Sequence, residues 1–530
     1  MALLYRFVKI QDRTNTHVFT FVVTKSVTRD LERDITSKEF VCGYQKWAIT
    51  FSRTDKVLGV FLIWRNASES MRAYVDFTFT ILNREHFSVN ESFSGKQIKF
   101  TYESPAHGNR NYIPVSDLYT RNFTDSNGEF QLELTIGNVR TVYETHFRVP
   151  HSIFSSLAAQ YQGEHHSAHA KGVDHSKMSQ KFESSYFSFG GFDWNLTIFP
   201  NGSSEAIDSD HKISVYLNRL TGFDHQCRIR YNLNLGEGEK LLDSGIVENV
   251  SDTDGKSHGW HPRVKFGDLV RKGVLRVRLE MIAANTLSEV TFAFKTSGGS
   301  APGGGIHPRG LVGESLVANP ALAQCYDRDK QGWTLKADCH SDTVRLHMIY
   351  KDVHNVPRNH LRYVCWNVYI MHQSRKSGRM EPVPLAGAPF SHYYAQESAD
   401  EGIIMETDVT IKELKEMACS SLADKSQMRV QVEWCESYLL FQANYHKYDD
   451  VGRTHSFQMR KEISALQAEN YSLERQLFSY QKSIAYAHSR RTYSDDVGTP
   501  DGHDEEYLSY YKERNYSIGD RSLSTDTEYA

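Results

Sequence analysis

Three short stretches, each opening with tryptophan, decide the fold: Trp47-Ala48-Ile49-Thr50-Phe51, Trp194-Asn195-Leu196-Thr197-Ile198-Phe199 and Trp333-Thr334-Leu335-Lys336-Ala337. In each stretch every second residue is apolar or aromatic. A period of two predicts a β-strand with one face on a core and the other toward water. Because the pattern occurs three times along the chain, the sequence predicts an internal repeat.

Each repeat continues in the same order. A second apolar strand is predicted at Leu58–Trp64, Ile213–Leu217 and Val344–Tyr350, and a third at Tyr74–Leu82, Cys227–Leu233 and Tyr363–Ile370. A short acidic and apolar element comes next, at Val115–Leu118, Phe266–Leu269 and Lys412–Leu414. A closing strand ends each repeat, at Phe130–Ile136, Val274–Leu279 and Met428–Trp434. Short strands separated by turn residues predict an all-β chain of tandem antiparallel β-sandwiches.

The ordered set resembles the MATH (meprin and TRAF homology, TRAF-like) domain family. The second repeat resembles it best, through His258-Gly259-Trp260 followed by Phe266-Gly267-Asp268-Leu269. The resemblance implies eight-stranded antiparallel sandwiches. It also implies a function, because family members bind short extended peptides in a groove beside an edge strand, a mode that needs exposed backbone donors.

The resemblance also points to residues. In well-known members a Trp-Gly-Phe-type triplet lines the peptide site. His258, Gly259 and Trp260 match it here, with histidine in place of the first tryptophan, and in the first repeat only Gly108 and Tyr112 match. These five residues are therefore the peptide-binding candidates. The alternative is that Trp260 is a packing residue at the edge of a sandwich.

Residues 455–487 change from a period of two to a heptad pattern. Ile463, Asn470, Leu477 and Ile484 fall at position a, and Met459, Leu466, Leu473 and Tyr480 at position d. Leucine at d and one asparagine at a favour a parallel homodimeric coiled coil, because two buried asparagines pair only in register. The alternative is an amphipathic helix packed on the third repeat of the same chain.

Composition sets the domain boundaries. The predicted order is a MATH-like domain (1–150), a linker (151–180), a second domain (181–296), a Gly-rich linker (297–322), a divergent third domain (323–448), the coiled coil (455–487) and an acidic, Ser- and Tyr-rich disordered tail (488–530). The tail has too few aliphatic residues to offset its ordering entropy. Its tyrosines are either phosphorylated docking sites or unmodified solvated residues.

The bulk composition narrows the function classes. With 61 basic and 65 acidic residues, the net charge of −4 favours neither a nucleic-acid nor a membrane-surface partner. The first residues lack the apolar core of a signal peptide, and no apolar run reaches the ~20 residues of a membrane span. The seven cysteines include no C-x-x-C pair, so no disulfide framework or zinc site is expected. A cytoplasmic protein is predicted.

Candidate chemical sites are few. His165, His166, His169 and His175 form a possible metal cluster, but their segment has the composition of a linker. The glycines of residues 298–305 lack the Lys-Ser/Thr of a phosphate loop. No catalytic motif is present. The sequence therefore predicts a non-enzymatic adaptor or scaffold without a cofactor, which binds proteins or peptides. A structural component of a cytoskeletal or junctional assembly and, more remotely, a metal-dependent enzyme are the alternatives.

Overall fold

The computed structural model describes residues 2–10, 15–29, 33–54, 56–151, 181–202, 213–253, 258–293, 321–338, 343–373, 380–397, 402–410, 413, 427–442 and 446–494. Apart from their end residues, the predicted linkers 151–180 and 297–322 lie outside these ranges, together with the four clustered histidines and the glycines. The predicted tail lies outside them beyond residue 494.

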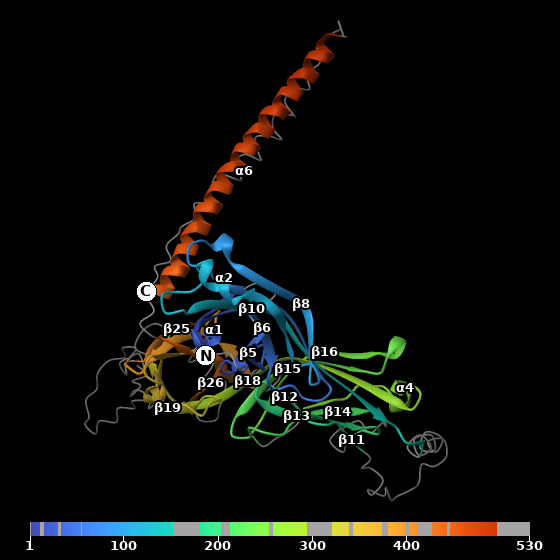
Figure 1. Cartoon of the computed structure of the whole chain (residues 1–530). Helices are drawn as coiled ribbons and strands as arrows, with labels where there is room; N and C mark the ends of the chain where they lie inside the picture. The colour runs from blue at the N-terminus through green and yellow to red at the C-terminus, as the bar shows by residue number, and fades with distance from the viewer. Residues whose placement is uncertain are drawn as a thin grey trace, which may run out of the picture. The chain divides into compact units, whose positions relative to one another are not determined.

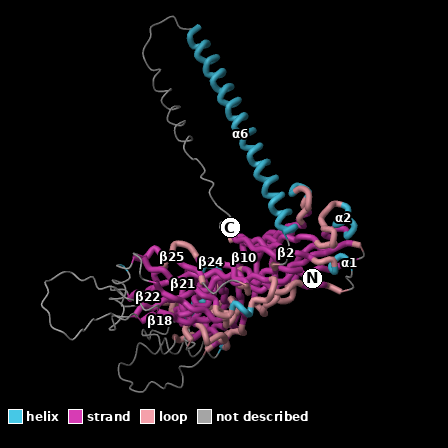
Figure 2. Tube along the Cα trace, turned by 90° about the vertical axis from the view of Figure 1, so that its left-hand side faces the viewer, coloured by secondary structure: helices cyan, strands magenta, loops and turns pink. Residues whose placement is uncertain are grey.

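Strands dominate the described residues, so the all-β prediction is confirmed (Figure 2). The chain opens with β1 (Ala2–Ile10), β2 (Thr16–Val23) and α1 (Ser26–Arg29) (Figure 1). The first strand set comprises β3 (Ile35–Thr36), β4 (Phe40–Cys42), β5 (Gln45–Thr54), β6 (Val57–Trp64), β7 (Met71–Ile81), η1 (Phe87–Val89), β8 (Glu91–Thr101), β9 (Ala106–Pro114), α2 (Val115–Thr120) and β10 (Phe130–Arg148).

The second strand set comprises β11 (Phe182–Glu183), β12 (Phe187–Phe189), β13 (Phe192–Phe199), β14 (Ser214–Arg219), β15 (Gln226–Leu235), η3 (Gly238–Lys240), β16 (Leu242–Ser251), β17 (His258–Trp260), α4 (Phe266–Leu269) and β18 (Val274–Ala293). The third comprises β19 (Ala321–Tyr326), β20 (Gly332–Asp338), β21 (Thr343–Tyr350), η4 (Val353–Asn355), β22 (His360–Gln373), β23 (Met380–Pro384), β24 (Phe390–Ala395), β25 (Ile403–Thr410) and β26 (Gln427–Phe441).

Each strand set forms one small antiparallel sheet, and the three sheets share one strand order. The orders are β3-β5-β6-β9, β11-β13-β14-β17 and β19-β20-β21-β25. The three tryptophan strands of the sequence lie in β5, β13 and β20, which take the second place in each order. The internal repeat is therefore visible in the strand order of the small sheets.

The three tryptophans perform the same task. Each is fully buried and donates its indole N–H across the preceding hairpin turn, Trp47 to Cys42 O at 2.9 Å, Trp194 to Phe189 O at 3.0 Å and Trp333 to Asp327 Oδ2 at 2.9 Å. A buried indole needs such a partner, because an unpaired N–H in a core costs about 1–3 kcal/mol. These hydrogen bonds therefore hold the hairpin turn before each tryptophan against the core.

The remaining strands form one sheet of 12 strands that runs through all three sets. The long closing strands join the sets. The second half of β10 pairs antiparallel with the first half of β18, over Thr141–Arg148 and Val274–Met281. The second half of β18 pairs in the same way with the first half of β26, over Thr286–Ala293 and Gln427–Trp434. We call these two ladders the first and second seams.

Apolar packing follows the same plan. The small sheets pack on the large one through aromatic rings such as Trp47 on Phe100 of β8 and Trp333 on Trp434 of β26, with ring centroids 5.1 Å apart in both pairs. One hydrophobic core includes residues of the first two sets and also Tyr363 and Tyr438 of the third. Residues 1–455 accordingly form one compact unit, and residues 456–530 a second.

Helix α6 spans His446–Ser494, so it is longer at both ends than the predicted 455–487. Its first turns belong to the β unit. Val451 is buried there, His455 Nε2 lies 2.7 Å from Asn83 O, and the Tyr5 hydroxyl donates to the Asp449 carboxylate. The sequence pattern missed these turns because their contacts come from distant strands. Of the helices described, none is long and apolar enough to cross a membrane.

Candidate functional site

The three residues predicted in the second repeat, His258, Gly259 and Trp260, form β17 at the edge of its small sheet. β17 pairs with β14, placing Trp260 opposite Val215 and Gly259 opposite Tyr216. A Cβ on Gly259 would lie 2.6 Å from the Tyr216 ring, so glycine lets that ring cross the strand. Within the described ranges the other edge of β17 has no strand partner. Its outward N–H and C=O groups suit an added strand.

Aromatic side chains surround β17. The Tyr216 ring centroid lies 5.5 Å from that of His261 and 5.6 Å from that of Phe199, both edge to face. His261 is exposed, whereas Trp260 is half-buried and packs against the core. A half-buried Trp260 is compatible with both predicted roles, edge packing and peptide contact. Tyr216 is itself buried, so the rings that apolar side chains of a peptide could reach are the exposed His261 and the half-buried Phe199 and Trp260.

The two candidates of the first repeat lie on β9, the corresponding edge strand. Gly108 pairs with β6 so closely that a Cβ there would lie 2.1 Å from Val60 O. Tyr112 is buried, and its hydroxyl lies 3.0 Å from Phe79 O and 2.6 Å from Glu91 O. Burial raises the Tyr112 pKa. Gly108 therefore allows the close approach of β9 to β6, and Tyr112 fixes β9 on the core from inside.

The third repeat has an edge strand that sequence reasoning missed. β25 (Ile403–Thr410) pairs with β21 and takes the same last place in its sheet that β9 and β17 take in theirs. Its residues alternate between buried and exposed, with Met405, Thr407 and Val409 inside. The alternation in Ile403–Thr410 is a signal that could have identified it. All three small sheets thus end on an equivalent strand.

The predicted coiled-coil residues lie on α6 and are exposed. Exposure of the apolar ones runs from 42% for Met459 to 67% for Tyr480, with Ile463, Leu466, Leu473, Leu477 and Ile484 between, and Asn470 is also exposed. A continuous apolar stripe on a helix marks an interaction surface.

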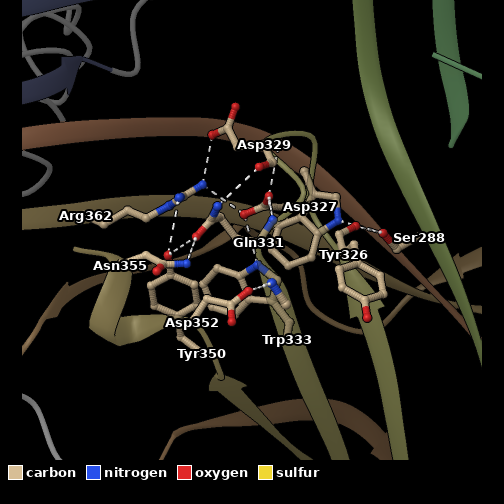
Figure 3. Close-up of polar contacts among 12 residues, drawn as sticks. Ser288, Tyr326, Asp327, Asp329, Gln331, Trp333, Tyr350, Asp352, Asn355 and Arg362 are labelled. Atoms are coloured by element: carbon tan, nitrogen blue, oxygen red, sulfur yellow. Dashed lines mark hydrogen bonds and ion pairs between the residues drawn. The ribbon is translucent and has the colours of Figure 1, made fainter. Parts of the chain in front are cut away.

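An ionic cluster, in which Asp327 is buried and Asp329 exposed, anchors the third tryptophan hairpin (Figure 3). Arg362 of β22 donates to Asp327 at 2.9 Å and to Asp329 at 2.8 Å, and Asp327 also accepts from Trp333. Burial raises the Asp327 pKa by more than the charge of Arg362 lowers it. Because these groups bond one another, the cluster fixes the β19–β20 turn on β22. Sequence reasoning gave no sign of it.

A second buried cluster crosses the second seam. Glu433 of β26 receives Arg228 Nη1 at 3.1 Å, the Tyr369 hydroxyl at 2.7 Å and Asn285 Nδ2 at 2.8 Å, while Arg228 Nη2 donates to Gln431 at 3.1 Å. The side chains of Arg228 and Glu433 are 10% and 5% exposed. Both charged groups thus have several hydrogen-bond partners, as a buried ion pair requires, although Asn285 Oδ1 is buried without one. It ties the second strand set to the third.

The described residues contain no candidate metal site, and the comparisons with known proteins identify no family. In the part of the chain that the structure describes, no group of three or more His, Cys, Asp or Glu side chains could hold a metal ion. No family model matches the chain, and no curated protein matches it. A crystal structure of AerE from Microcystis aeruginosa matches 47% of this chain and 91% of its own, at 9% identity and a TM-score of 0.10. So low a score carries no argument.

Proposed function

We propose that the chain is a non-enzymatic adaptor whose three strand sets are TRAF-like sandwiches that bind extended segments of partner proteins. One observation carries the proposal: β9, β17 and β25 end their small sheets at equivalent places, each with an outer edge that has no strand partner in the described residues. A peptide added to such an edge gains main-chain hydrogen bonds, and neighbouring side chains supply specificity. The rings around β17 make the second set the best-equipped of the three.

The proposal includes self-association through α6. The exposed heptad stripe supports a parallel homodimer, in which Asn470 pairs with its own copy. Two weak edges held in one dimer gain avidity without new contacts. We also propose a cytoplasmic location. Sedimentation of the full-length chain tests the dimer, and a monomer over the working concentration range would remove this part of the proposal.

Peptide capture at β17 can be tested by affinity purification with intact protein and Trp260→Ala. We expect specific partners to be lost from the variant and kept by Tyr102→Ala, which truncates an aromatic residue that is 54% exposed and lies outside β17. Because Trp260 packs on the core, a second variant, His261→Asp, changes an exposed residue of the same flank, whose ring contacts Tyr216 and whose Nδ1 lies 2.8 Å from Ser214 Oγ. Unchanged partners with both variants would refute peptide capture at β17.

A structural role is the second candidate. The common sheet and the core shared by all three sets favour a rigid building block of a cytoskeletal or junctional assembly. Unchanged partners in the Trp260→Ala experiment, together with loss of assembly on disruption of α6, would favour this role over the adaptor.

A further inference from the structure

The junction between the third strand set and the N-terminal hairpin differs from the first two seams. Each of those seams is an antiparallel ladder of eight residue pairs. The first half of β10 pairs instead with β2, and β2 pairs with β1. β1 then lies beside the second half of β26, but no ladder between them exists in the described residues. We call this junction the third seam.

Side chains close one end of the third seam. Lys9 Nζ lies 2.7 Å from Glu436 Oε1, His17 Nε2 lies 3.2 Å from the same oxygen, and the rings of Phe7 and Tyr438 are 4.4 Å apart. These contacts bring β1 against β26 at its Lys9 end. They occupy the position that hydrogen bonds hold in the first two seams.

The other end of the third seam contains a cavity of about 250 Å³. Its walls come from the start of β1, the end of β26 and the β4 hairpin, and they are mainly apolar: Ala2, Leu4, Phe21, Phe40, Leu439 and Phe441. Ser437, Lys38 and Glu39 also line it and are exposed, so the cavity reaches the surface. We call it the third-seam pocket.

The charges at the mouth of this pocket are unequal. Glu39 is paired with Arg65, Nε to Oε1 at 3.3 Å. Lys38 has no ion-pair partner among the residues that the structure describes. The mouth therefore offers one unpaired cation above an apolar interior. This combination complements a ligand with a bulky apolar group next to a carboxylate.

Size decides what kind of ligand fits. Small-molecule sites are commonly about 300–1,000 Å³, so 250 Å³ suits a single large side chain better than a cofactor. One wall is the start of β1, the strand that ends the strand order of the large sheet; β26 covers the outer edge of β1 at its Lys9 end, so main-chain groups are presented at the Ala2–Leu4 end. An edge strand beside an apolar pocket is the arrangement that recognises extended peptides.

We propose that the third-seam pocket binds an extended segment of a partner protein, with one bulky apolar side chain inside, an acidic residue facing Lys38, and its main chain along the Ala2–Leu4 end of the outer edge of β1. This site is separate from β9, β17 and β25, and it stands or falls independently of peptide capture there.

The test selects a display library of short random peptides on the full-length protein and measures the selected peptides by fluorescence anisotropy. We expect them to share a large apolar residue next to Asp or Glu. Ser437→Phe, which fills the mouth from an exposed position, should weaken binding at least tenfold, whereas Ser92→Phe on exposed β8 should not. Lys38→Glu should weaken binding of the selected peptides severalfold. The same variant should bind peptides in which lysine replaces the acidic residue about as tightly as the unchanged protein binds the selected ones.

Two outcomes overturn the proposal. One is a selection without that common pattern, and the other is binding that Ser437→Phe leaves unchanged. Peptides that respond to Trp260→Ala but not to Ser437→Phe would support the β17 edge and refute the third-seam pocket. Peptides that respond to Ser437→Phe but not to Trp260→Ala would have the reverse meaning.

Discussion

Removing the cation of the buried Glu433 cluster should loosen the junction of the second and third strand sets. In Arg228→Met the Glu433 carboxylate keeps its bonds from Tyr369 and Asn285 but loses the one ion-pair partner that it has among the described residues. Arg228 also gives up its bond to Gln431 and its position 4.5 Å from the Tyr369 ring centroid. Breaking one side of a buried pair costs about 3–5 kcal/mol.

Hydrogen exchange measured by mass spectrometry is the suitable assay, because a chain of this size need not unfold in one step. At about 1.4 kcal/mol per factor of ten, exchange in β18 and β26 should rise by roughly two to four orders of magnitude. The control is Arg230→Met on the same strand, whose side chain is 45% exposed and pairs with exposed Glu248. A change of about 0–1 kcal/mol is expected there.

The double variant Arg228→Met/Glu433→Gln separates charge from packing. With both charges gone, no buried ion remains unpaired, so the double variant should be less destabilised than the sum of the two single variants by at least about 1–2 kcal/mol. Strict additivity, or less than a tenfold effect of Arg228→Met on exchange, would refute the argument that this pair fixes the second seam.

Three further predictions follow from single contacts. Gly108→Ala should cost about 1–3 kcal/mol in thermal or urea unfolding, since its Cβ would meet Val60 O at 2.1 Å; the same change at Gly267, where a Cβ meets no atom within 4 Å, is the control. Burial raises the pKa of Glu436, but the bonds and charges of His17 and Lys9 outweigh it and hold the pKa below 4.5. Glu436 therefore stabilises the folded state above pH 4.5, and this stabilisation is lost as the pH falls through the lowered value. After division by the intrinsic amide exchange rate, which itself falls on acidification, exchange in β1 should rise as the pH is lowered, and Glu436→Gln should flatten that response. Asn470→Val should leave α6 associated but mix its oligomeric states in sedimentation, because in the proposed dimer the paired asparagines are buried and set the register at a cost in stability; a pure dimer in the variant would contradict this role.

Local pattern predicted the strands well. β5, β13 and β20 contain the three tryptophan stretches, and both Val115–Leu118 and Phe266–Leu269 are short helices with a buried leucine. These features depend on residues close together in the chain, where a period of two or a single apolar contact is legible. The resemblance likewise led to β9 and β17, which are edge strands in the structure.

The sequence did not predict which strands pair with one another over long distances along the chain. The closing strands were predicted only in their first halves, and nothing in Thr141–Arg148 indicates that its partner is Val274–Met281. Arg228 and Glu433 lie 205 residues apart, so neither residue alone signals a buried pair. The third-seam pocket is formed by residues from both ends of the β unit. Period and composition describe which face of a strand is buried, but they do not name its neighbour.

Because β18 pairs with two different strand sets, it limits how repeats can be lost or gained in evolution. Its first half completes the ladder with β10, and its second half completes the ladder with β26. Excising the middle repeat would open one edge of the second half of β10 and one edge of the first half of β26, which would keep only β7 and β22 as neighbours, and exposed strand edges invite aggregation. The repeats look interchangeable in sequence, yet losing, duplicating or shuffling one is penalised unless the flanking halves change with it. We therefore expect the three repeats to be inherited together, and sequence variation to be confined to strands outside the two seams.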